Sequence, residues 1–243
     1  MAFAAFVVCL LLWTAGVPPA GPAVSPPPQR VAILGDSVAR GAGDESRLGI
    51  AGNLRGLSVT NLGIDGARTF TVLRHLRNDA VREAVRGADA VIVSIGGNDL
   101  FGDTRARLWS TFAPQLSMRR AALRVRRVVH AVRHENATAR IYLLGLYNPY
   151  RAAWLDPHIA KWDARLIVMF AETRGVTVIR IADVLASPAA ISPLDRFHPS
   201  AKGYRALAEL WTAAAQLPLC ESGGDAAAVQ SFATRLPAGT PSR

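Results

Sequence analysis

The stretch from Arg30 to Arg40, RVAILGDSVAR, constrains the fold of this chain more than any other segment. Its apolar run, Val31 to Leu34, is unbroken and ends at Gly35. Such a run predicts a strand buried on both faces of a parallel sheet, because a strand with one solvated face would alternate apolar and polar residues. Sheets of this type belong to α/β proteins, whose strands alternate with helices.

Ser37 lies just past this predicted strand and its glycine turn. In open α/β sheets, ligands bind in the crevice at the carboxyl ends of the strands, so a hydroxyl group here is a candidate nucleophile. A simpler interpretation also fits, in which Asp36 or Ser37 caps the next helix and Gly35 only supplies the turn. The other segments of the chain have to decide between the two.

Four more segments carry strand patterns. They are 58–63 (SVTNLG), 90–95 (AVIVSI), 140–146 (RIYLLGL) and 176–181 (VTVIRI). Segments with a helical spacing of apolar residues lie between them, so strands and helices alternate along the chain. This alternation predicts a three-layer α/β/α sandwich with a central five-stranded parallel sheet and helices on both faces.

The helical segments have apolar stripes that predict which side of each helix is buried. One helix is expected from about Thr69 to Arg86, stopped by Gly87, with a stripe formed by Leu73, Leu76, Ala80 and Ala84. A helical region from Thr104 to about Glu135 is interrupted at Pro114, and its later stripe is Met118, Ala122, Val125, Val129 and Val132. The last helix is capped by Ser200, and its stripe is Tyr204, Leu207, Ala208 and Trp211.

A length of 243 residues allows one α/β domain with a full core and is too short for two unless both are small. We expect this domain at residues 30–219 and expect it to act as a monomer. Residues 220–243 lack apolar periodicity and are predicted to be a disordered tail.

The N-terminal residues 2–17 carry no charged side chain. This segment is shorter than the ~20 residues of a membrane-spanning helix and resembles the apolar part of a secretory signal, with Ala20 and Ala23 as cleavage positions. A signal normally begins with Lys or Arg, which is missing here, so an uncleaved anchor stays open. Residues 1–23 are thus a predicted signal peptide or anchor, and residues 24–29 a proline-rich linker. The expected location is secreted or in the cell envelope.

The formal net charge of +10 comes from 28 basic and 18 acidic residues, and nearly all the basic ones are arginine. Arg120, Arg124 and Arg127 share one helix face, for which a solvated surface is the simplest interpretation. No aromatic platform accompanies them, which argues against nucleic acid. Peripheral contact with an anionic membrane or envelope surface remains an expectation. His130 and His134 are spaced i, i+4 without a carboxylate in the motif, so no metal site is expected.

Polar residues with complementary chemistry follow the predicted strand ends. A serine nucleophile needs a base, and the ordinary pKa of histidine lets its ring accept a proton near neutrality and return it to the leaving group. Asp195 lies three residues before His198, close enough to fix the imidazole tautomer for Ser37. Asp183, just after the fifth strand, is the competing carboxylate. The backbone N–H groups of Ser37 and Gly66 and the side-chain amide of Asn98 are available as donors to an oxyanion.

These residues fall in four blocks through which the chain resembles an SGNH hydrolase of the GDSL esterase and lipase superfamily. The blocks are Gly35-Asp36-Ser37, Asn61 to Gly66, Gly96-Gly97-Asn98-Asp99 and Asp195 to Pro199, in family order. The resemblance spans roughly residues 30 to 215. The LLGLYNPY stretch is most similar to the bacterial lipolytic branch.

This resemblance implies a flavodoxin-like fold and a role for each candidate residue. Ser37 would be the nucleophile, with His198 and Asp195 as the rest of a triad, and Ser37, Gly66 and Asn98 would form the oxyanion hole. Gly66 is preferred to Gly63 because the functional glycine of the family follows the asparagine of the block by five positions. Val38 replaces the usual leucine after the serine and leaves the chemistry untouched.

The implied function is that of a serine esterase, which hydrolyses carboxylic esters with short to medium acyl chains through an acyl-enzyme on Ser37. Its substrate would be a small-molecule or lipid ester, and no metal or organic cofactor is implied. The first alternative is an O-acetyl esterase acting on a cell-envelope glycan. A catalytically silent binding domain on the same fold is an alternative of another class, and the intact Ser37, Asn98 and His198 argue against it.

Overall fold

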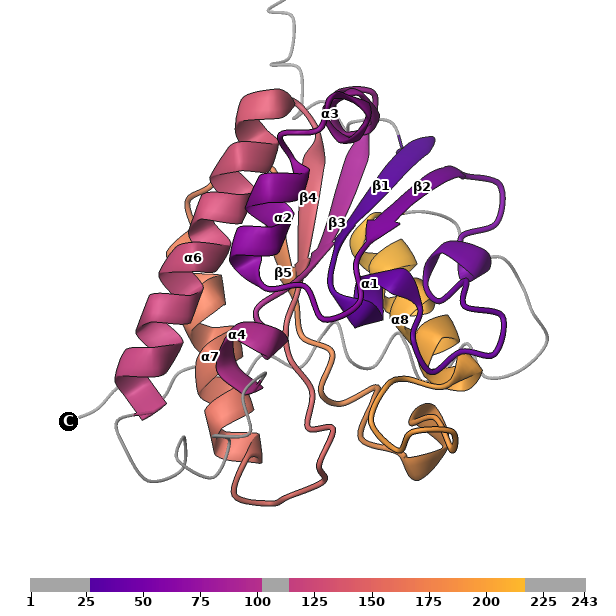
Figure 1. The fold of residues 1–243 in the computed structure, drawn as a ribbon, viewed down its shortest axis with the longest axis vertical. Helices are drawn as coiled ribbons and strands as arrows, with labels where there is room; N and C mark the ends of the chain where they lie inside the picture. The colour runs from indigo at the N-terminus through magenta and orange to yellow at the C-terminus, as the bar shows by residue number, and fades with distance from the viewer. Residues whose placement is uncertain (1–26, 102–113, 217–243) are drawn as a thin grey trace, which may run out of the picture.

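The computed structural model describes residues 27–101 and 114–216 (Figure 1). Its five strands form one sheet in the order β2-β1-β3-β4-β5, and every neighbouring pair is parallel. The strands are β1 (Arg30–Gly35), β2 (Ser58–Gly63), β3 (Ala90–Ser94), β4 (Arg140–Leu144) and β5 (Val176–Ile179). The predicted α/β fold with a five-stranded parallel sheet is therefore confirmed.

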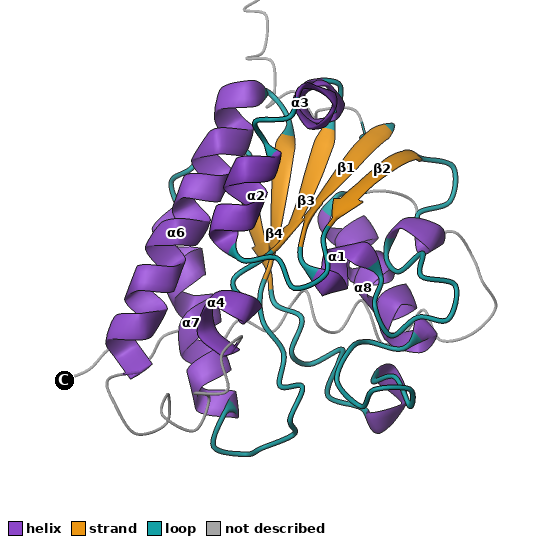
Figure 2. Ribbon diagram, in the orientation of Figure 1, coloured by secondary structure: helices purple, strands orange, loops and turns teal. Residues whose placement is uncertain are grey.

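Helices cover both faces of this sheet (Figure 2). One layer contains α2 (Thr69–His75), α3 (Asp79–Arg86), α4 (Gly97–Phe101), α6 (Pro114–Glu135) and α7 (Asp156–Phe170). The other contains α1 (Ser37–Arg40), α8 (Ala201–Ala214) and the short 3-10 helix η1 (Ala51–Asn53). A second 3-10 helix, η2 (Pro188–Ala190), precedes α8. The three-layer sandwich matches the prediction.

The central strands supply both halves of the core, because successive side chains point to opposite faces of the sheet. Ala32 and Leu34 of β1 pack under α2, α6 and α7, whereas Val31 and Ile33 pack under α1 and α8. All four are buried, as the unbroken apolar run predicts. The predicted stripes of α6 and α8 are also confirmed, since every residue in them is buried.

The helix expected from Thr69 to Arg86 is instead two helices. Asn78 separates them, because its side chain accepts a hydrogen bond from the backbone N–H of Ala80 at 3.0 Å and so caps α3. The buried apolar side chains are Val72, Leu76, Val81 and Val85, and Leu73 packs against the same core, so the predicted stripe holds in the first helix and is wrong in the second, where Ala80 is exposed. The change of direction at Asn78 is what shifts the stripe.

Three strands end earlier than the sequence predicts. The predicted terminal residues Ile95, Leu146 and Ile181 lie beyond the ends of β3, β4 and β5 and line a pocket instead. Ile95 and Ile181 are also packed in the core, at 2% and 1% exposed, so their apolar character has two causes, core burial and the lining of the cavity.

Other predictions lie partly or wholly outside the described residues. These are the signal or anchor at 1–23, the first part of the linker at 24–26, the helical segment at 104–113, the end of the domain at 217–219 and the tail at 220–243. No helix within the described ranges has both the length and the hydropathy that crossing a bilayer requires.

The end of β1 provides a stability test. Gly35 has φ +145°, and a Cβ atom there would overlap the carbonyl oxygen of Ser94. We expect Gly35→Ala to lower the Tm by about 10 °C or more, since a strand of the sheet would have to move.

The matched control is Gly56→Ala. Gly56 also has a positive φ, +75°, but no atom lies within 4 Å of the position that a Cβ would take. Only the backbone penalty of ~1–2 kcal/mol then applies, equivalent to a Tm loss of a few degrees. Equal Tm losses in the two variants, measured by thermal unfolding, would contradict the steric argument.

Candidate active site

Ser37 lies at the point where the strand order of the sheet reverses. The chain leaves β1 at Gly35, and α1 begins at Ser37 next to the carboxyl end of β3. A crevice between β1 and β3 is where open sheets of this order bind ligands. The structure assigns the capping role at this turn to Asp36 and not to Ser37. The side chain of Asp36 accepts a hydrogen bond from the backbone N–H of Val38 at 3.0 Å. The hydroxyl of Ser37 is thus left for other contacts.

His198 connects Ser37 to Asp195. Its Nε2 lies 2.9 Å from Oγ of Ser37, and its Nδ1 lies 2.7 Å from Oδ2 of Asp195. The other carboxylate oxygen of Asp195 accepts hydrogen bonds from the backbone N–H groups of Phe197 and His198. One tight turn therefore fixes the carboxylate relative to the ring, as the sequence spacing predicts.

The environment of Asp195 favours its charged form. Partial burial raises the pKa of its carboxyl, but the hydrogen bonds from the ring and backbone of His198 and from Phe197 outweigh this effect, and the net pKa lies below the ordinary value. Asp183, the competing carboxylate, is exposed at the start of the segment that leads to η2. The contact with His198 is made by Asp195.

Asn98 lies in the first turn of α4, and its side chain borders the same cavity as Ser37. Its Nδ2 donates to the carbonyl of Ala67 at 3.0 Å, which ties Asn98 to the loop that contains Gly66. Gly66 has φ +70° and open space around it. Gly63, by contrast, is packed, because a Cβ there would overlap the backbone of Arg40. Glycine is therefore required at position 63 by close packing against α1.

Asp99 is a positioning residue that the sequence analysis did not single out. Its side chain is only 3% exposed and accepts from Oγ1 and the backbone N–H of Thr69, at 2.7 and 2.9 Å. Arg124 lies 3.7 Å away on its outer side. Asn98 and Asp99 therefore hold the segment from Ala67 to Thr69 at two points. The signal was present, since Asp99 belongs to the Gly96–Asp99 block.

Asp36 is buried next to Ser37. Burial raises the pKa of its carboxyl to about 7, although hydrogen bonds from the backbone of Val38 and from Ser94 oppose the shift. Oγ of Ser94 lies 3.4 Å from Oδ1 of Asp36, at the end of β3. The carboxyl group below Ser37 is thus held in place by both strands that border the crevice.

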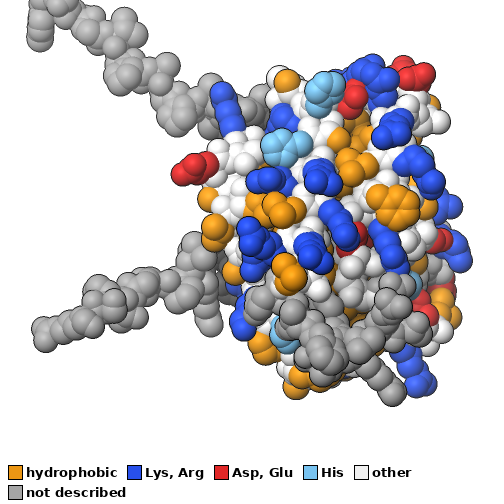
Figure 3. Space-filling model, turned by 60° about the vertical axis from the view of Figure 1, so that its left-hand side comes forward, with side chains coloured by type: hydrophobic (Ala, Val, Ile, Leu, Met, Phe, Trp, Pro, Cys, Tyr) orange, Lys and Arg blue, Asp and Glu red, His pale blue; other side chains and the backbone are white. Residues whose placement is uncertain are grey.

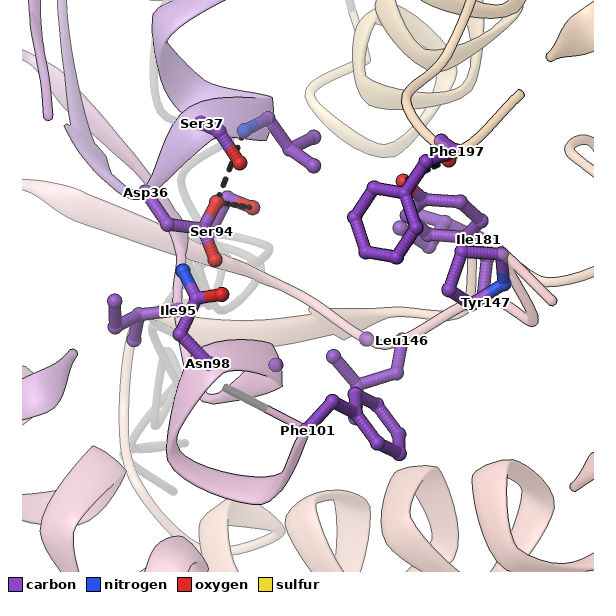
Figure 4. A pocket seen from close by; sticks show the side chains of 14 residues that line it. Asp36, Ser37, Ser94, Ile95, Asn98, Phe101, Leu146, Tyr147, Ile181 and Phe197 are labelled. Atoms are coloured by element: carbon purple, nitrogen blue, oxygen red, sulfur yellow. Dashed lines mark hydrogen bonds between the residues drawn. The ribbon is translucent and has the colours of Figure 1, made fainter. Parts of the chain in front are cut away.

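A cavity that opens to solvent is lined by Asp36, Ser37 and Asn98 together with apolar side chains. Figure 4 shows Ser37 and Asn98 on one side of it and the rings of Phe197 and Tyr147 across from them, with Leu146 and Phe101 nearby. The hydroxyl of Tyr147 donates to the carbonyl of Phe197 at 2.9 Å, which holds the residue before His198. The cavity thus has a polar wall that contains Ser37 and Asn98 and an apolar wall.

Metal ligands do not gather near this cavity. Within the described residues there is no group of three or more His, Cys, Asp or Glu side chains with the spacing of a metal site. His130 and His134 are exposed on α6. The side chains present at the cavity are those of nucleophilic and acid–base chemistry.

This fold and site define a serine ester hydrolase of the SGNH type. The chain belongs to the GDSL-like lipase/acylhydrolase family, whose sequence model matches residues 33–206. The family resemblance seen in the four sequence blocks is confirmed.

Individual relatives are more distant. The uncharacterised protein YpmR of Bacillus subtilis (strain 168) is 25% identical over 199 residues, which cover 74% of this chain and 78% of that protein. The lipase Lip_vut3 from a goat rumen metagenome is similar in structure, with a TM-score of 0.64 and 22% identity over 76% of this chain and 96% of its own. A catalytic mutant of Axe2, an acetylxylan esterase from Geobacillus stearothermophilus, gives a TM-score of 0.59 and 19% identity over 80% of this chain and 97% of its own. These solved structures share the fold.

The buried carboxyl of Asp36 predicts a pH dependence of stability. Its pKa is 3.8 in the unfolded chain and about 7 in the folded one, so between these values the folded state holds a proton that the unfolded state has released. The free energy of unfolding therefore falls as pH rises from about 4 to 7. Asp36→Asn cannot titrate, and relative to it the wild type should lose on the order of a few kcal/mol across this range.

Chemical denaturation of both proteins at several pH values measures this difference. Groups that titrate in both proteins cancel in the comparison. The control is Glu45→Gln at an exposed position, whose stability should follow the wild type at every pH. If the free energy of unfolding changes with pH in parallel for the wild type and Asp36→Asn, the pKa of Asp36 is not raised in the folded protein.

Proposed function

We propose that this protein hydrolyses carboxylic esters with short to medium acyl chains through an acyl-enzyme on Ser37. The observation that carries the proposal is the continuous contact of Ser37, His198 and Asp195, with 2.9 Å between Oγ and Nε2 and 2.7 Å between Nδ1 and Oδ2. These are the distances that a nucleophile, its base and an orienting carboxylate require.

In the first half of the reaction, Oγ of Ser37 attacks the ester carbonyl carbon while its proton passes to Nε2 of His198. The negative charge of Asp195 stabilises the imidazolium that forms. The tetrahedral intermediate then collapses, the bond to the alcohol oxygen breaks, and His198 returns the proton to that oxygen. The alcohol leaves and the acyl group stays on Ser37.

In the second half, a water molecule takes the place of the alcohol. His198 accepts a proton from the water as its oxygen attacks the acyl carbon. Collapse of the second tetrahedral intermediate returns the proton to Oγ of Ser37 and releases the carboxylic acid. The enzyme ends in its starting state, and the net reaction consumes one ester and one water.

Oxyanion stabilisation is assigned to the backbone N–H groups of Ser37 and Gly66 and to the amide of Asn98. One N–H of Asn98 is engaged by Ala67, which orients the amide and leaves its second N–H available. The contacts of Asp99 with Thr69 hold the adjoining loop. Donors that are fixed before the reaction cost no reorganisation when charge develops on the carbonyl oxygen.

The acyl preference is inferred from the apolar wall of the cavity. Phe101, Leu146, Ile181 and Phe197 would contact a chain longer than acetyl, and burial of each methylene group contributes about 0.8 kcal/mol. An acetyl ester of a glycan would leave this wall unused. The lining therefore favours an acyl chain of several carbons over the O-acetyl alternative.

The proposal includes a place of action in the cell envelope or outside the cell. Its support is the uncharged segment 2–17 followed by the prolines of the linker, a pattern typical of a secretory signal or an anchor. A monomer is sufficient for the chemistry, since Ser37, His198 and Asp195 come from one chain.

Hydrolysis of p-nitrophenyl esters from acetate to decanoate tests the proposal. The wild type should react fastest with chains of intermediate length and should be labelled by a fluorophosphonate. Ser37→Ala should lose the label and at least about 10⁴-fold in kcat, as removal of a triad nucleophile does. A maximum at acetate would favour the O-acetyl alternative, and undiminished hydrolysis by Ser37→Ala would end the assignment.

The identity of the carboxylate gives a second prediction. Asp195→Asn should keep the fold and lower kcat by up to about 10⁴-fold, because the amide favours the wrong imidazole tautomer. Asp183→Asn is the matched control and should stay near wild type, since Asp195 holds the ring. Loss of activity at unchanged Tm in Asp183→Asn, with Asp195→Asn near wild type, would show that the triad is wrongly assigned.

A further inference from the structure

The outer surface of α2 and α6 carries a concentration of positive charge. We define the basic face as the exposed side chains of Arg74, Arg77, Arg120, Arg124 and Arg127. The sequence of α6 contains no acidic residue before Glu135, and α2 contains none. Figure 3 shows Lys and Arg side chains gathered over one side of the molecule, with few acidic ones among them. The excess charge of the chain is thus unevenly distributed.

The acidic groups near the basic face neutralise only a part of it. Glu135, at the end of α6, is shared by Arg82 and Arg86, which lie outside the basic face, at 3.2 and 2.7 Å. Asp99 is 3% exposed and lies 3.7 Å from Arg124, so it partly neutralises that arginine, and the exposed Asp79 is paired with Arg82 at 3.3 Å. The basic face therefore presents a net positive field to an approaching surface.

Two exposed apolar side chains lie at the ends of the same helix faces. Phe70 is 61% exposed in the first turn of α2, four residues before Arg74. Leu116 is 46% exposed in the first turn of α6, four residues before Arg120. Residues four apart lie on one side of a helix. Each helix thus presents an apolar side chain followed by arginines, and α2 begins just after the Gly66 loop of the candidate site.

We propose that the basic face docks on the anionic lipids of a bilayer, with the arginines on headgroup phosphates and Phe70 and Leu116 entering the boundary with the acyl chains. Arginine is suited to phosphate because its planar fork donates two parallel hydrogen bonds. Interfacial helices combine basic residues with exposed aromatic and leucine side chains in this way. Docking uses none of Ser37, His198 and Asp195, so it is independent of the proposed catalysis.

Co-sedimentation of the full chain with vesicles tests the proposal. Vesicles of phosphatidylcholine alone are compared with vesicles containing about 30% phosphatidylglycerol, and the difference removes any contribution of the apolar N-terminal segment. Binding should rise with the anionic fraction and fall with added salt. The variant Arg74→Gln/Arg120→Gln/Arg127→Gln should bind the anionic vesicles about 100-fold more weakly than the wild type, at roughly fivefold for each basic side chain removed.

The matched control removes three positive charges from the opposite layer. Arg55→Gln/Lys202→Gln/Arg205→Gln lowers the net charge equally and should bind like the wild type if position matters more than total charge. Both variants should hydrolyse a soluble aryl ester at the wild-type rate, which separates docking from catalysis. Equal losses in the two variants, equal binding to neutral and anionic vesicles, or binding of a duplex oligonucleotide without vesicle binding would overturn the proposal.

Discussion

The close approach of β1 and β3 at their carboxyl ends is the constraint on which the site depends. The backbone N–H of Asp36 donates to the carbonyl of Ser94 at 3.0 Å, and Gly35 lies so near this carbonyl that no side chain fits. The chain can then turn at once into α1, with Ser37 in its first turn beside β3. A wider separation would carry Ser37 away from Asn98, which follows β3, and the two would no longer border one cavity.

A buried carboxyl at this junction has both a structural use and a cost. Asp36 caps α1 and meets Ser94, which fixes the start of the helix on two strands. Burial also raises its pKa to about 7, so near neutral pH the charged form is disfavoured by its surroundings. The free energy of unfolding near neutral pH is thus lower than it would be with an uncharged cap at this position. Proteins accept such a cost at functional sites, where local order matters more than total stability.

Sequence reasoning succeeded where one residue pattern had one physical cause. The run from Val31 to Leu34 could only be a strand buried on both faces, and the spacing of Asp195 and His198 required one turn. It failed where two causes give the same pattern. Ile95, Leu146 and Ile181 pack against the core and line the cavity just past the strand ends, so their apolar pattern does not show where each strand stops. Asn78 was missed because a capping asparagine within a continuous helical spacing resembles an exposed helix residue.

The contacts of Asp99 connect the candidate site with the basic face. On its inner side Asp99 binds Thr69, the first residue of α2, next to the loop that holds Gly66. On its outer side it faces Arg124 of the basic face at 3.7 Å. Because α2 and α6 are packed together over the sheet, the start of α2 cannot shift without moving Phe70 and Arg74 as well. The position of the basic face relative to the segment from Gly66 to Thr69 is therefore set in part by the hydrogen bonds between Asp99 and Thr69.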